Sequence, residues 1–281
     1  MDGYRLTEDK IAGFEEHLRG EEHGVATVEK YLRNVRFFAA WLDGEAVSKE
    51  AVARWKAYLQ EKGFAPCTVN SKLSALNSFF AYAGLEGYQV KFLHIQRKVF
   101  RDNSRDLSRG EYVKLVGEAR RQGKEQLGMV IETIGATGIR VSELAYITVE
   151  AVRAGRATVC LKGKVRVILM TKKLCRKLLK YAKGKGIKSG QIFVTKNGKG
   201  ISRRQVWREM KAVSAQAGVE SSKVFPHNLR HMFATVFYKM CHDIVKLADV
   251  LGHSSIETTR IYLITTGEEH SRQMNRLELV I

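Results

Sequence analysis

The sequence has few cysteines, very little proline and no long hydrophobic run. Its four cysteines show no C-x-x-C spacing, which argues against a zinc site or a disulfide framework and favours reduced thiols. With two prolines in 281 residues, any linker is charged rather than stiffened. No apolar run approaches membrane-spanning length, and the polar start, MDGYRLTEDK, lacks a signal-peptide core. These absences predict a cytoplasmic protein without a membrane partner.

Acidic residues are scarce in the second part of the sequence. Residues 1–100 carry 14 Lys and Arg against 13 Asp and Glu, whereas residues 101–281 carry 34 against 16. Between Glu150 and Lys211 there are 19 basic residues and two acidic ones. A merely soluble basic protein rarely needs such a bias, but a protein that binds a phosphate backbone uses it. The charge distribution therefore favours a nucleic-acid partner, and the second part of the chain as its main contact.

Apolar periodicity over the first hundred residues predicts four amphipathic helices. In the second of them, Val28, Leu32 and Val35 recur at helical spacing. The aromatic residues Phe37, Phe38, Trp41, Phe79 and Phe80 are expected in the core rather than stacked on bases. Together the helices would make a compact helical domain. They are predicted at Leu6–Arg19 (with Thr7 as N-cap), Thr27–Leu42, Ser48–Lys62 and Thr68–Ala83.

A second domain follows a charged linker. The basic segment 97–106 has no apolar period, so it is interpreted as the linker between a domain at 1–96 and a domain at 107–281. Residues Arg156–Met170 give the clearest β signal: two apolar stretches are joined by KGK, which predicts a hairpin. The remaining pattern is helical. The predicted fold is therefore mainly α with a small β-sheet. The further helices are expected after Ser108, which forms a capping box with Glu111, and at Gln126–Ala136, Thr171–Lys185 and Ser202–Ala217.

The segment 225–263, FPHNLRHMFATVFYKMCHDIVKLADVLGHSSIETTRIYL, carries most of the chemistry. Pro226 suits the first position of a helix, which would place His227 and Arg230 on one face. Asp243 and Gly252 are suited to begin and end a second helix. Ser255 can cap a third helix, and that helix is predicted to carry Tyr262. Three short helices would thus bring His227, Arg230, His253 and Tyr262 together.

These residue types suit phosphoryl transfer to a tyrosine. Guanidinium groups bind phosphate with two parallel hydrogen bonds. Imidazole can donate to an oxyanion or move a proton near neutral pH, and a phenol can act as a covalent nucleophile. A second guanidinium is available upstream from Arg140, in ATGIRVSEL. Two guanidiniums can neutralise a phosphate, and the sequence has neither a tight Asp/Glu cluster nor a Walker-type glycine loop, so no metal and no cofactor is expected.

The order of three motifs resembles one known family. ATGIRVSEL, HNLRH and LGHSS follow one another, and Tyr262 comes nine residues after His253. This pattern is similar to that of the tyrosine recombinases, the phage integrase and Xer group. The segments ATVEKYLRNVRFFAAWL and CTVNSKLSALNSFFAYAG also resemble the SAM-like core-binding domain of that family. The length points to its compact two-domain type, similar to Xer recombinases.

The resemblance implies roles for six catalytic residues. Tyr262 would attack a phosphodiester to give a 3′-phosphotyrosine, while Arg140 and Arg230 clamp the non-bridging oxygens. His253 would donate a further hydrogen bond and His227 would accept the tyrosine proton, although the two histidines could exchange these roles. A lysine of the hairpin would protonate the leaving 5′-oxygen. Lys162 matches that lysine better, and Lys164 is its competitor because the hairpin tip is about one residue shorter than the common pattern. His231 is interpreted as structural.

Several further residues are expected to contact DNA. Lys30 and Arg33 lie on the polar face of the second predicted helix. The resemblance implies that Asn70 and Lys72 approach DNA as well. In the second domain, Lys164, Arg203 and Arg204 are candidates for phosphate or groove contacts.

The resemblance also implies partners, and it leaves alternatives open. Its members act as tetramers on two DNA sites with inverted repeats, through a Holliday junction, in some cases with an accessory protein. The apolar C-terminal residues Leu277, Leu279, Val280 and Ile281 need a place to bury, in the chain's own domain or on a neighbouring protomer. A type IB topoisomerase, a catalytically silent DNA-binding protein and an RNA-binding protein remain the alternatives. Integration, excision and dimer resolution are not distinguished.

Overall fold

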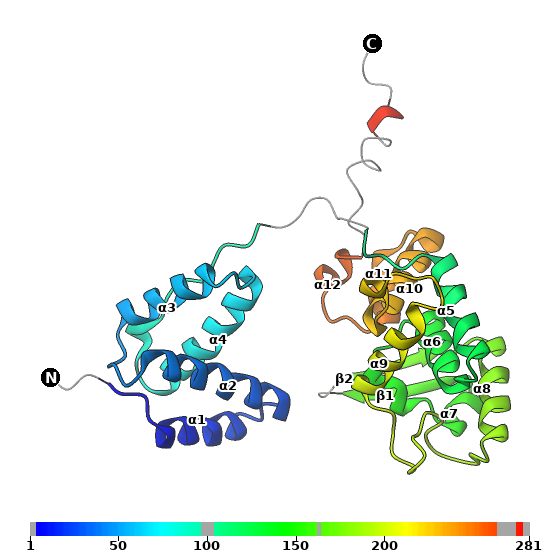
Figure 1. The fold of residues 1–281 in the computed structure, drawn as a ribbon, viewed down its shortest axis with the longest axis horizontal. Helices are drawn as coiled ribbons and strands as arrows, with labels where there is room; N and C mark the ends of the chain where they lie inside the picture. The colour runs from blue at the N-terminus through cyan, green and yellow to red at the C-terminus, as the bar shows by residue number, and fades with distance from the viewer. Residues whose placement is uncertain (1–3, 97–103, 162–163, 263–273, 278–281) are drawn as a thin grey trace. The chain divides into compact units, whose positions relative to one another are not determined.

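The computed structural model describes residues 4–96, 104–161, 164–262 and 274–277. The chain divides into two compact units, Met1–Arg97 and Lys98–Ile281 (Figure 1). Each unit has its own hydrophobic core. Most of the predicted linker lies outside the described residues. Within the described ranges, no helix is both long enough and apolar enough to cross a membrane.

The first unit is a bundle of four helices, as the apolar periodicity predicted, followed by a short 3₁₀ helix. Ser48 caps its third helix, because the serine hydroxyl accepts a hydrogen bond from the backbone N–H of Ala51 (3.1 Å). Thr7 stands at the N-cap of the first helix, but its side chain makes no capping bond. The elements are α1 (Glu8–Gly20), α2 (Val25–Leu42), α3 (Lys49–Glu61), α4 (Pro66–Tyr82) and η1 (Glu86–Tyr88).

Aromatic side chains fill the core of this bundle. Phe38 meets Trp55 edge-on with ring centroids 5.1 Å apart, and Phe14 meets Phe79 in the same way at 5.3 Å. All four side chains, and that of Phe80, are fully buried. The prediction of an aromatic core is therefore confirmed for Phe38, Phe79 and Phe80, which are not available to stack on bases, whereas Phe37 and Trp41 are partly buried and pack against this core.

The second unit consists of helices and one two-stranded sheet. The predicted capping box is confirmed: the Ser108 hydroxyl accepts from the backbone of Glu111, and the Glu111 carboxylate accepts from the backbone of Ser108. The mainly α fold with a small sheet is therefore as predicted. The elements are α5 (Arg109–Arg121), α6 (Glu125–Thr137), η2 (Val141–Tyr146), α7 (Val149–Arg153), β1 (Arg156–Leu161), β2 (Lys164–Leu169), α8 (Lys172–Gly184), α9 (Arg203–Ser214), η3 (Ser221–Lys223), α10 (Pro226–Cys241), α11 (Ile244–Leu251) and α12 (Ile256–Arg260).

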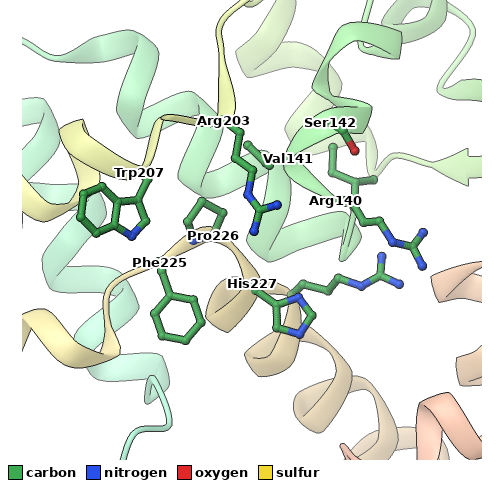
Figure 2. Close-up of a pocket in the computed structure, with 10 residues that line it drawn as sticks. Arg140, Val141, Ser142, Arg203, Trp207, Phe225, Pro226 and His227 are labelled. Carbon is green, nitrogen blue, oxygen red and sulfur yellow. The ribbon is translucent and has the colours of Figure 1, made fainter. Parts of the chain in front are cut away.

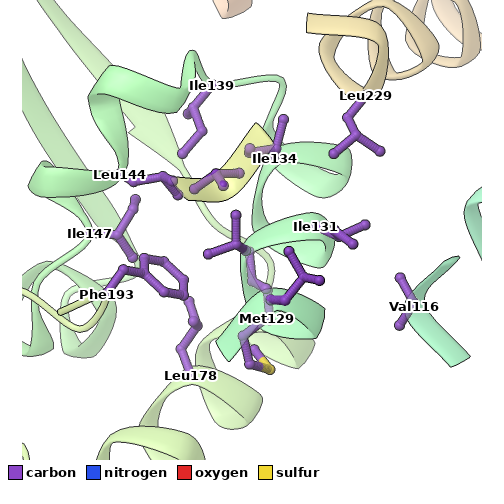
Figure 3. Close-up of a cluster of buried hydrophobic side chains, with 14 of the residues drawn as sticks. Val116, Met129, Ile131, Ile134, Ile139, Leu144, Ile147, Leu178, Phe193 and Leu229 are labelled. Atoms are coloured by element: carbon purple, nitrogen blue, oxygen red, sulfur yellow. The ribbon is translucent and has the colours of Figure 1, made fainter. Parts of the chain in front are cut away.

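Helix α6 is the centre of the second core. It packs against α5, α8, α9 and α10, and its sequence is apolar on most faces, as expected of a helix surrounded by others. Figure 3 shows Ile131 and Ile134 of α6 among Leu229 of α10, Leu178 of α8 and Phe193 of a loop. All of these side chains are buried. The end of α6, which leads to Arg140, is thereby held rigidly against α10.

The predicted hairpin is confirmed. Strands β1 and β2 are antiparallel, with Ala157 opposite Ile168 and Val159 opposite Arg166. These four residues share the inward face, and the three apolar ones are buried. Arg166 is thus a cation on the inner face of a strand, at a position where an apolar side chain would be expected.

Candidate active site

The first turn of α10 presents two of the predicted catalytic side chains. Pro226 occupies the first helical position, as predicted, after an extended Phe225. His227 is exposed on this turn, whereas Arg230 is only 1% exposed. The three-residue spacing therefore places an accessible imidazole above a buried guanidinium.

A pocket of about 310 Å³ lies at this end of α10. Its walls come from three elements that are far apart in the sequence: the start of η2, the helix α9 and the start of α10. Figure 2 shows the side chains of Arg140, Arg203 and His227 around this space. The lining residues are Ile139, Arg140, Val141, Ser142, Arg203, Trp207, Phe225, Pro226, His227 and Arg230.

Arg140 is held in place by a buried carboxylate. The Glu143 carboxylate accepts hydrogen bonds from the backbone N–H of Arg140 (2.6 Å) and from its guanidinium (3.2 Å). Glu143 is 1% exposed, whereas the side chain of Arg140 is 43% exposed. The carboxylate thus orients the guanidinium from below and leaves its outer side accessible to an anion.

Gly138 lets α10 approach the end of α6. This residue ends α6 with φ +64°, a left-handed conformation that favours glycine. A Cβ atom at this position would also collide with the ring of Phe233 on α10. The carbonyl of Gly138 accepts a hydrogen bond from Nη1 of Arg230 (2.6 Å). The glycine therefore joins the two arginine-bearing elements at close range.

Arg230 is surrounded by hydrogen-bond acceptors. Besides Gly138, the carbonyl of Leu251 accepts from its Nη2 (2.9 Å), and the same nitrogen lies 2.8 Å from Nε2 of His253. Burial is the main cause that lowers the pKa of Arg230 to about 10, and the nearby Arg140 cation lowers it further. The Tyr262 phenol acts in the opposite direction. Arg230 therefore stays protonated at neutral pH and supplies a fixed positive charge.

His253 is neutral, and its tautomer follows from its neighbours. Burial is the main cause that lowers the pKa of His253 to about 4, and the cations Arg230 and Arg140 contribute to the same shift. A guanidinium can only donate, so Nε2 of the imidazole accepts from Arg230. The proton then sits on Nδ1 and is donated to Oγ1 of Thr259, 2.8 Å away. Thr259 is fully buried and fixes the orientation of the ring.

Tyr262 lies against the same group. Its side chain is 5% exposed, and its ring stacks on that of His253 with centroids 5.8 Å apart. The prediction that a helix carries this tyrosine is wrong. Helix α12 ends at Arg260, and Tyr262 lies in the following turn, where its N–H donates to the carbonyl of Thr259 (3.0 Å). Ser255, predicted as the cap of this helix, stands at the N-cap without a side-chain bond.

Three imidazole rings surround the tyrosine. The His227 ring centroid is 6.3 Å from that of Tyr262, and the His231 centroid is nearer, at 4.9 Å in an edge-on contact. His231 is buried, and its Nδ1 lies 3.4 Å from Oγ1 of Thr235. His231, interpreted as structural from the sequence, therefore contacts the tyrosine directly through its ring.

The structure describes only one of the two candidate lysines, and only its backbone. Lys162 lies outside the described residues. The backbone of Lys164 begins β2, opposite Leu161. The choice between the two lysines therefore stays as the sequence left it.

The predicted DNA contacts of the first unit differ in their surroundings. Lys30 and Arg33 are exposed on α2. The Asn70 amide is bonded on both sides to the backbone of Leu93, to its carbonyl at 2.9 Å and its N–H at 2.7 Å, so it holds the segment after the bundle. The ammonium of Lys72 lies 4.2 Å from the centre of the Phe37 ring. Burial lowers the pKa of Lys72, and the positive charge of the nearby Arg33 lowers it further.

In the second unit, Arg203 and Arg204 are exposed at the start of α9. Arg203 lines the pocket together with Arg140 and His227. Arg204 does not line it. Of this pair, Arg203 is therefore the one placed next to the predicted catalytic residues.

Sequence reasoning missed three supporting residues. Glu143 could have been found from its position three residues after Arg140, since an acid at that spacing can bond back to the start of a helix. Thr259 and Arg166 have no such local signal, because the residues that they contact are distant in the chain or in another element. Their roles follow from the tertiary structure.

Two family models match the chain. The Phage integrase family model matches residues 105–269, and the model of the Phage integrase N-terminal SAM-like domain matches residues 11–87. The two matches fall in the two structural units. The predicted core-binding and catalytic domains therefore each have a counterpart in this family.

Known relatives match nearly the whole chain. Tyrosine recombinase XerA of Thermococcus kodakarensis is 29% identical over 277 residues, covering 96% of this chain and 95% of that protein. Tyrosine recombinase XerC of Roseiflexus castenholzii is 29% identical over 279 residues, covering 90% and 88%.

A solved structure shares the fold. A crystal structure of a lambda integrase tetramer bound to a Holliday junction has a TM-score of 0.73 at 18% identity, covering 93% of this chain and 78% of that chain. At this identity the likeness concerns the fold. The family model, however, spans more than half of the sequence, and it covers Arg140, Arg230, His253 and Tyr262. The chain therefore belongs to the phage integrase family, the tyrosine recombinases.

Proposed function

We propose that this site-specific recombinase cleaves and rejoins DNA strands through a covalent bond between Tyr262 and a 3′-phosphate. The observation that carries the proposal is the group formed by Tyr262, His253, Arg230 and Arg140. The tyrosine ring stacks on the histidine, and that histidine contacts the buried arginine. A phenol, an imidazole and two guanidiniums within one group are the components that phosphoryl transfer to tyrosine requires.

In the proposed cleavage step, the Tyr262 oxygen attacks the phosphorus atom and the bond to the 5′-oxygen breaks. The phenol proton passes to His227, which is exposed on the first turn of α10. The leaving 5′-oxygen takes a proton from Lys162 or Lys164 at the hairpin tip. Arg140 and Arg230 stabilise the negative charge of the transition state, and each such donor contributes on the order of 3 kcal/mol.

His253 has to change its hydrogen bonding to take part. Its Nε2 accepts from Arg230 and its Nδ1 donates to Thr259. When a phosphate oxygen takes the hydrogen bond of Arg230, Nε2 of His253 is released. If the ring proton moves from Nδ1 to Nε2, and the Thr259 hydroxyl donates to Nδ1 in its place, the ring can donate to the same phosphate. The low pKa of His253 agrees with a neutral donor rather than a third cation beside Arg140 and Arg230.

The reaction is proposed to conserve the energy of the broken bond. A free 5′-hydroxyl from another strand attacks the phosphotyrosine, which restores the phosphodiester and releases Tyr262. Two such exchanges on paired sites pass through a Holliday junction. The lambda integrase tetramer, which shares this fold, is bound to a Holliday junction in its crystal structure, and this supports the scheme. We therefore propose double-stranded DNA with inverted-repeat sites as the substrate, bound by a tetramer, in some reactions with an accessory protein.

Recovery of covalent protein–DNA adducts tests the proposal. Cells that express the wild type or Tyr262→Phe are lysed in denaturing detergent, and the DNA attached to the protein is sequenced. We expect adducts at a discrete inverted-repeat site with the wild type and none with the variant. Phe at this position keeps the ring contacts and removes the nucleophile.

The same experiment separates the alternatives. Adducts scattered over the DNA without sequence preference would indicate topoisomerase-like relaxation. Adducts that persist with Tyr262→Phe would show that another residue is the nucleophile. Specific DNA binding without adducts, even on a nicked site that traps the cleaved state, would indicate a catalytically silent DNA-binding protein.

A further inference from the structure

Arg166 is a largely buried cation that links the hairpin to the catalytic group. It lies on the inner face of β2, and its side chain is 12% exposed. Its Nη2 donates to the carboxylate of Glu143, and its Nη1 donates to the carbonyl of Val250 (3.0 Å). Glu143 orients Arg140, and Val250 lies near the end of α11, three residues before His253. One side chain therefore contacts the supports of two catalytic residues.

The chain leaves room for this side chain at Gly252. This glycine ends α11 with φ +66°. A Cβ atom here would collide with Cδ of Arg166 and would lie 3.0 Å from its Nε. The glycine is therefore required twice, for the left-handed conformation and for the close passage of Arg166.

Stability does not explain why a guanidinium occupies this position. Nε of Arg166 is buried and has no hydrogen-bond partner among the described residues. A buried N–H without a partner destabilises the fold, and a buried ion pair is commonly no more stabilising than apolar side chains of similar volume. The neighbouring inward positions of the hairpin carry the apolar residues Ala157, Val159 and Ile168. A role in the site therefore accounts for Arg166 better than a role in the core.

The location of Arg166 along β2 indicates what it controls. It is opposite Val159 and two residues from Lys164, one of the two candidate lysines. On the other strand, the Tyr146 hydroxyl donates to the carbonyl of Cys160 (2.8 Å). Among the described residues β1 and β2 pair with each other and with no third strand. The position of the two strands relative to the rest of the unit therefore depends on such side-chain contacts.

We propose that Arg166 is a positioning residue that sets the hairpin, and with it the lysine that protonates the leaving oxygen, relative to Arg140 and His253. Gly252, which has no side chain, leaves the space that the Arg166 side chain occupies. This inference rests on the proposed function, because it assigns the hairpin lysine a step in DNA cleavage. Beyond that function, we infer that the guanidinium of Arg166 fixes the position of the hairpin lysine relative to Arg140 and His253, the two phosphate-binding side chains.

A substrate with a sulfur leaving group tests this inference. Replacing the bridging 5′-oxygen at the cleavage site by sulfur produces a thiolate, which leaves without a proton. For Arg166→Gln we expect cleavage of the oxygen substrate to fall by about 100-fold, the loss of a general acid, and cleavage of the sulfur substrate to fall by less than about tenfold. Arg166→Lys retains the charge without the two-pronged geometry, and we expect the same selective loss.

The control is Lys177→Gln, which removes one cation from the ion pair with Glu132 (2.6 Å) in the same unit. This change should leave both cleavage rates within about twofold of the wild type, as expected for a pair outside the pocket. Equal losses on the two substrates for both Arg166 variants would overturn the inference. If the wild type forms no covalent adduct with either substrate, the proposed function itself fails.

Whether Gly252 is needed to make room for Arg166 can be tested without measuring DNA cleavage. Gly252→Ala should lower the melting temperature in the wild type. In an Arg166→Ala background the collision is absent, so the same substitution should lower the melting temperature by clearly less. Equal decreases in the two backgrounds would show that Gly252 does not serve Arg166, and the positioning role would lose its structural basis.

Discussion

The two units of this recombinase bury different kinds of residues. Among the described residues of the first unit, Asn34 is the one polar side chain that is buried, and the core is built from Phe14, Phe38, Trp55 and their neighbours. The catalytic unit buries Arg230, His231 and Thr259 near the tyrosine and Glu143 beneath Arg140, among other polar residues. The first unit obtains its stability from apolar burial. In the second unit the burial of polar and charged side chains lowers the free energy of unfolding, but it holds charges where a phosphate has to be bound.

The comparison extends to the surface. The first hundred residues are nearly neutral, whereas the rest of the chain carries a net charge of +18, that is 34 basic minus 16 acidic residues. Buried charge and surface charge thus occur in the same unit. Both are expected where a polyanion is bound and cleaved.

The largest expected effect is on the stability of the first unit. Trp55 is fully buried between Phe37 and Phe38. Trp55→Ala should lower the free energy of unfolding of this unit by about 3–5 kcal/mol, because it removes a large apolar side chain and leaves a cavity. Chemical denaturation with separate reporters in the two units would measure it.

Trp207→Ala is the matched control. Trp207 is 47% exposed on α9 in the catalytic unit. Its replacement should change stability by less than about 0.5 kcal/mol. A similar loss for both tryptophans would contradict the view that apolar burial stabilises the first unit in particular.

Arg230→Lys should have the second largest effect, on catalysis. Lysine keeps the positive charge but cannot donate at once to Gly138, Leu251 and a phosphate oxygen in the geometry of guanidinium. We expect single-turnover cleavage of a nicked site to slow by about 100- to 1000-fold, the loss of one transition-state donor. At saturating DNA the exposed Arg204→Lys serves as the control, with a rate near that of the wild type. A rate above one tenth of the wild type for Arg230→Lys would show that charge suffices.

The smallest expected effect is on the pH dependence of stability. The pKa of His253 is about 4 in the folded protein and 6.5 in its ordinary range, so the unfolded chain binds more protons between these values. The neutral ring therefore contributes stability above pH 6.5, and that contribution is lost as the pH falls toward 4. His253→Asn should remove up to one proton from the slope of unfolding free energy between pH 6.5 and 5.

His242→Asn is the control for this measurement. His242 is exposed after the end of α10, with φ +51°, a conformation that asparagine tolerates. Its replacement removes an exposed imidazole from the same unit, so it is the comparison for the loss of one histidine. If His253→Asn and the wild type show the same slope, the imidazole is not the group that titrates.

Much of the fold could be predicted from the sequence because its signals are local. Apolar spacing located the four helices of the first unit, and the capping box of Ser108 and Glu111 marked the start of α5. The hairpin was found from two apolar stretches around KGK. The wrong prediction concerned Tyr262, placed in a helix that ends at Arg260. The backbone N–H of Tyr262 donates to the carbonyl of Thr259, three residues back, so the chain leaves the four-residue bonding of an α-helix at this point.

The sequence by itself determined the residue types of the site, because Arg140, Arg230, His253 and Tyr262 lie in ordered motifs with characteristic spacing. The tertiary structure alone decided how they are held. Arg230 sets the tautomer of His253, Thr259 holds its ring, and Arg166 reaches Glu143 and the end of α11 from another element. Such contacts join residues 6 to 84 positions apart. No local pattern encodes them, because they arise only when separate helices and strands pack around one core.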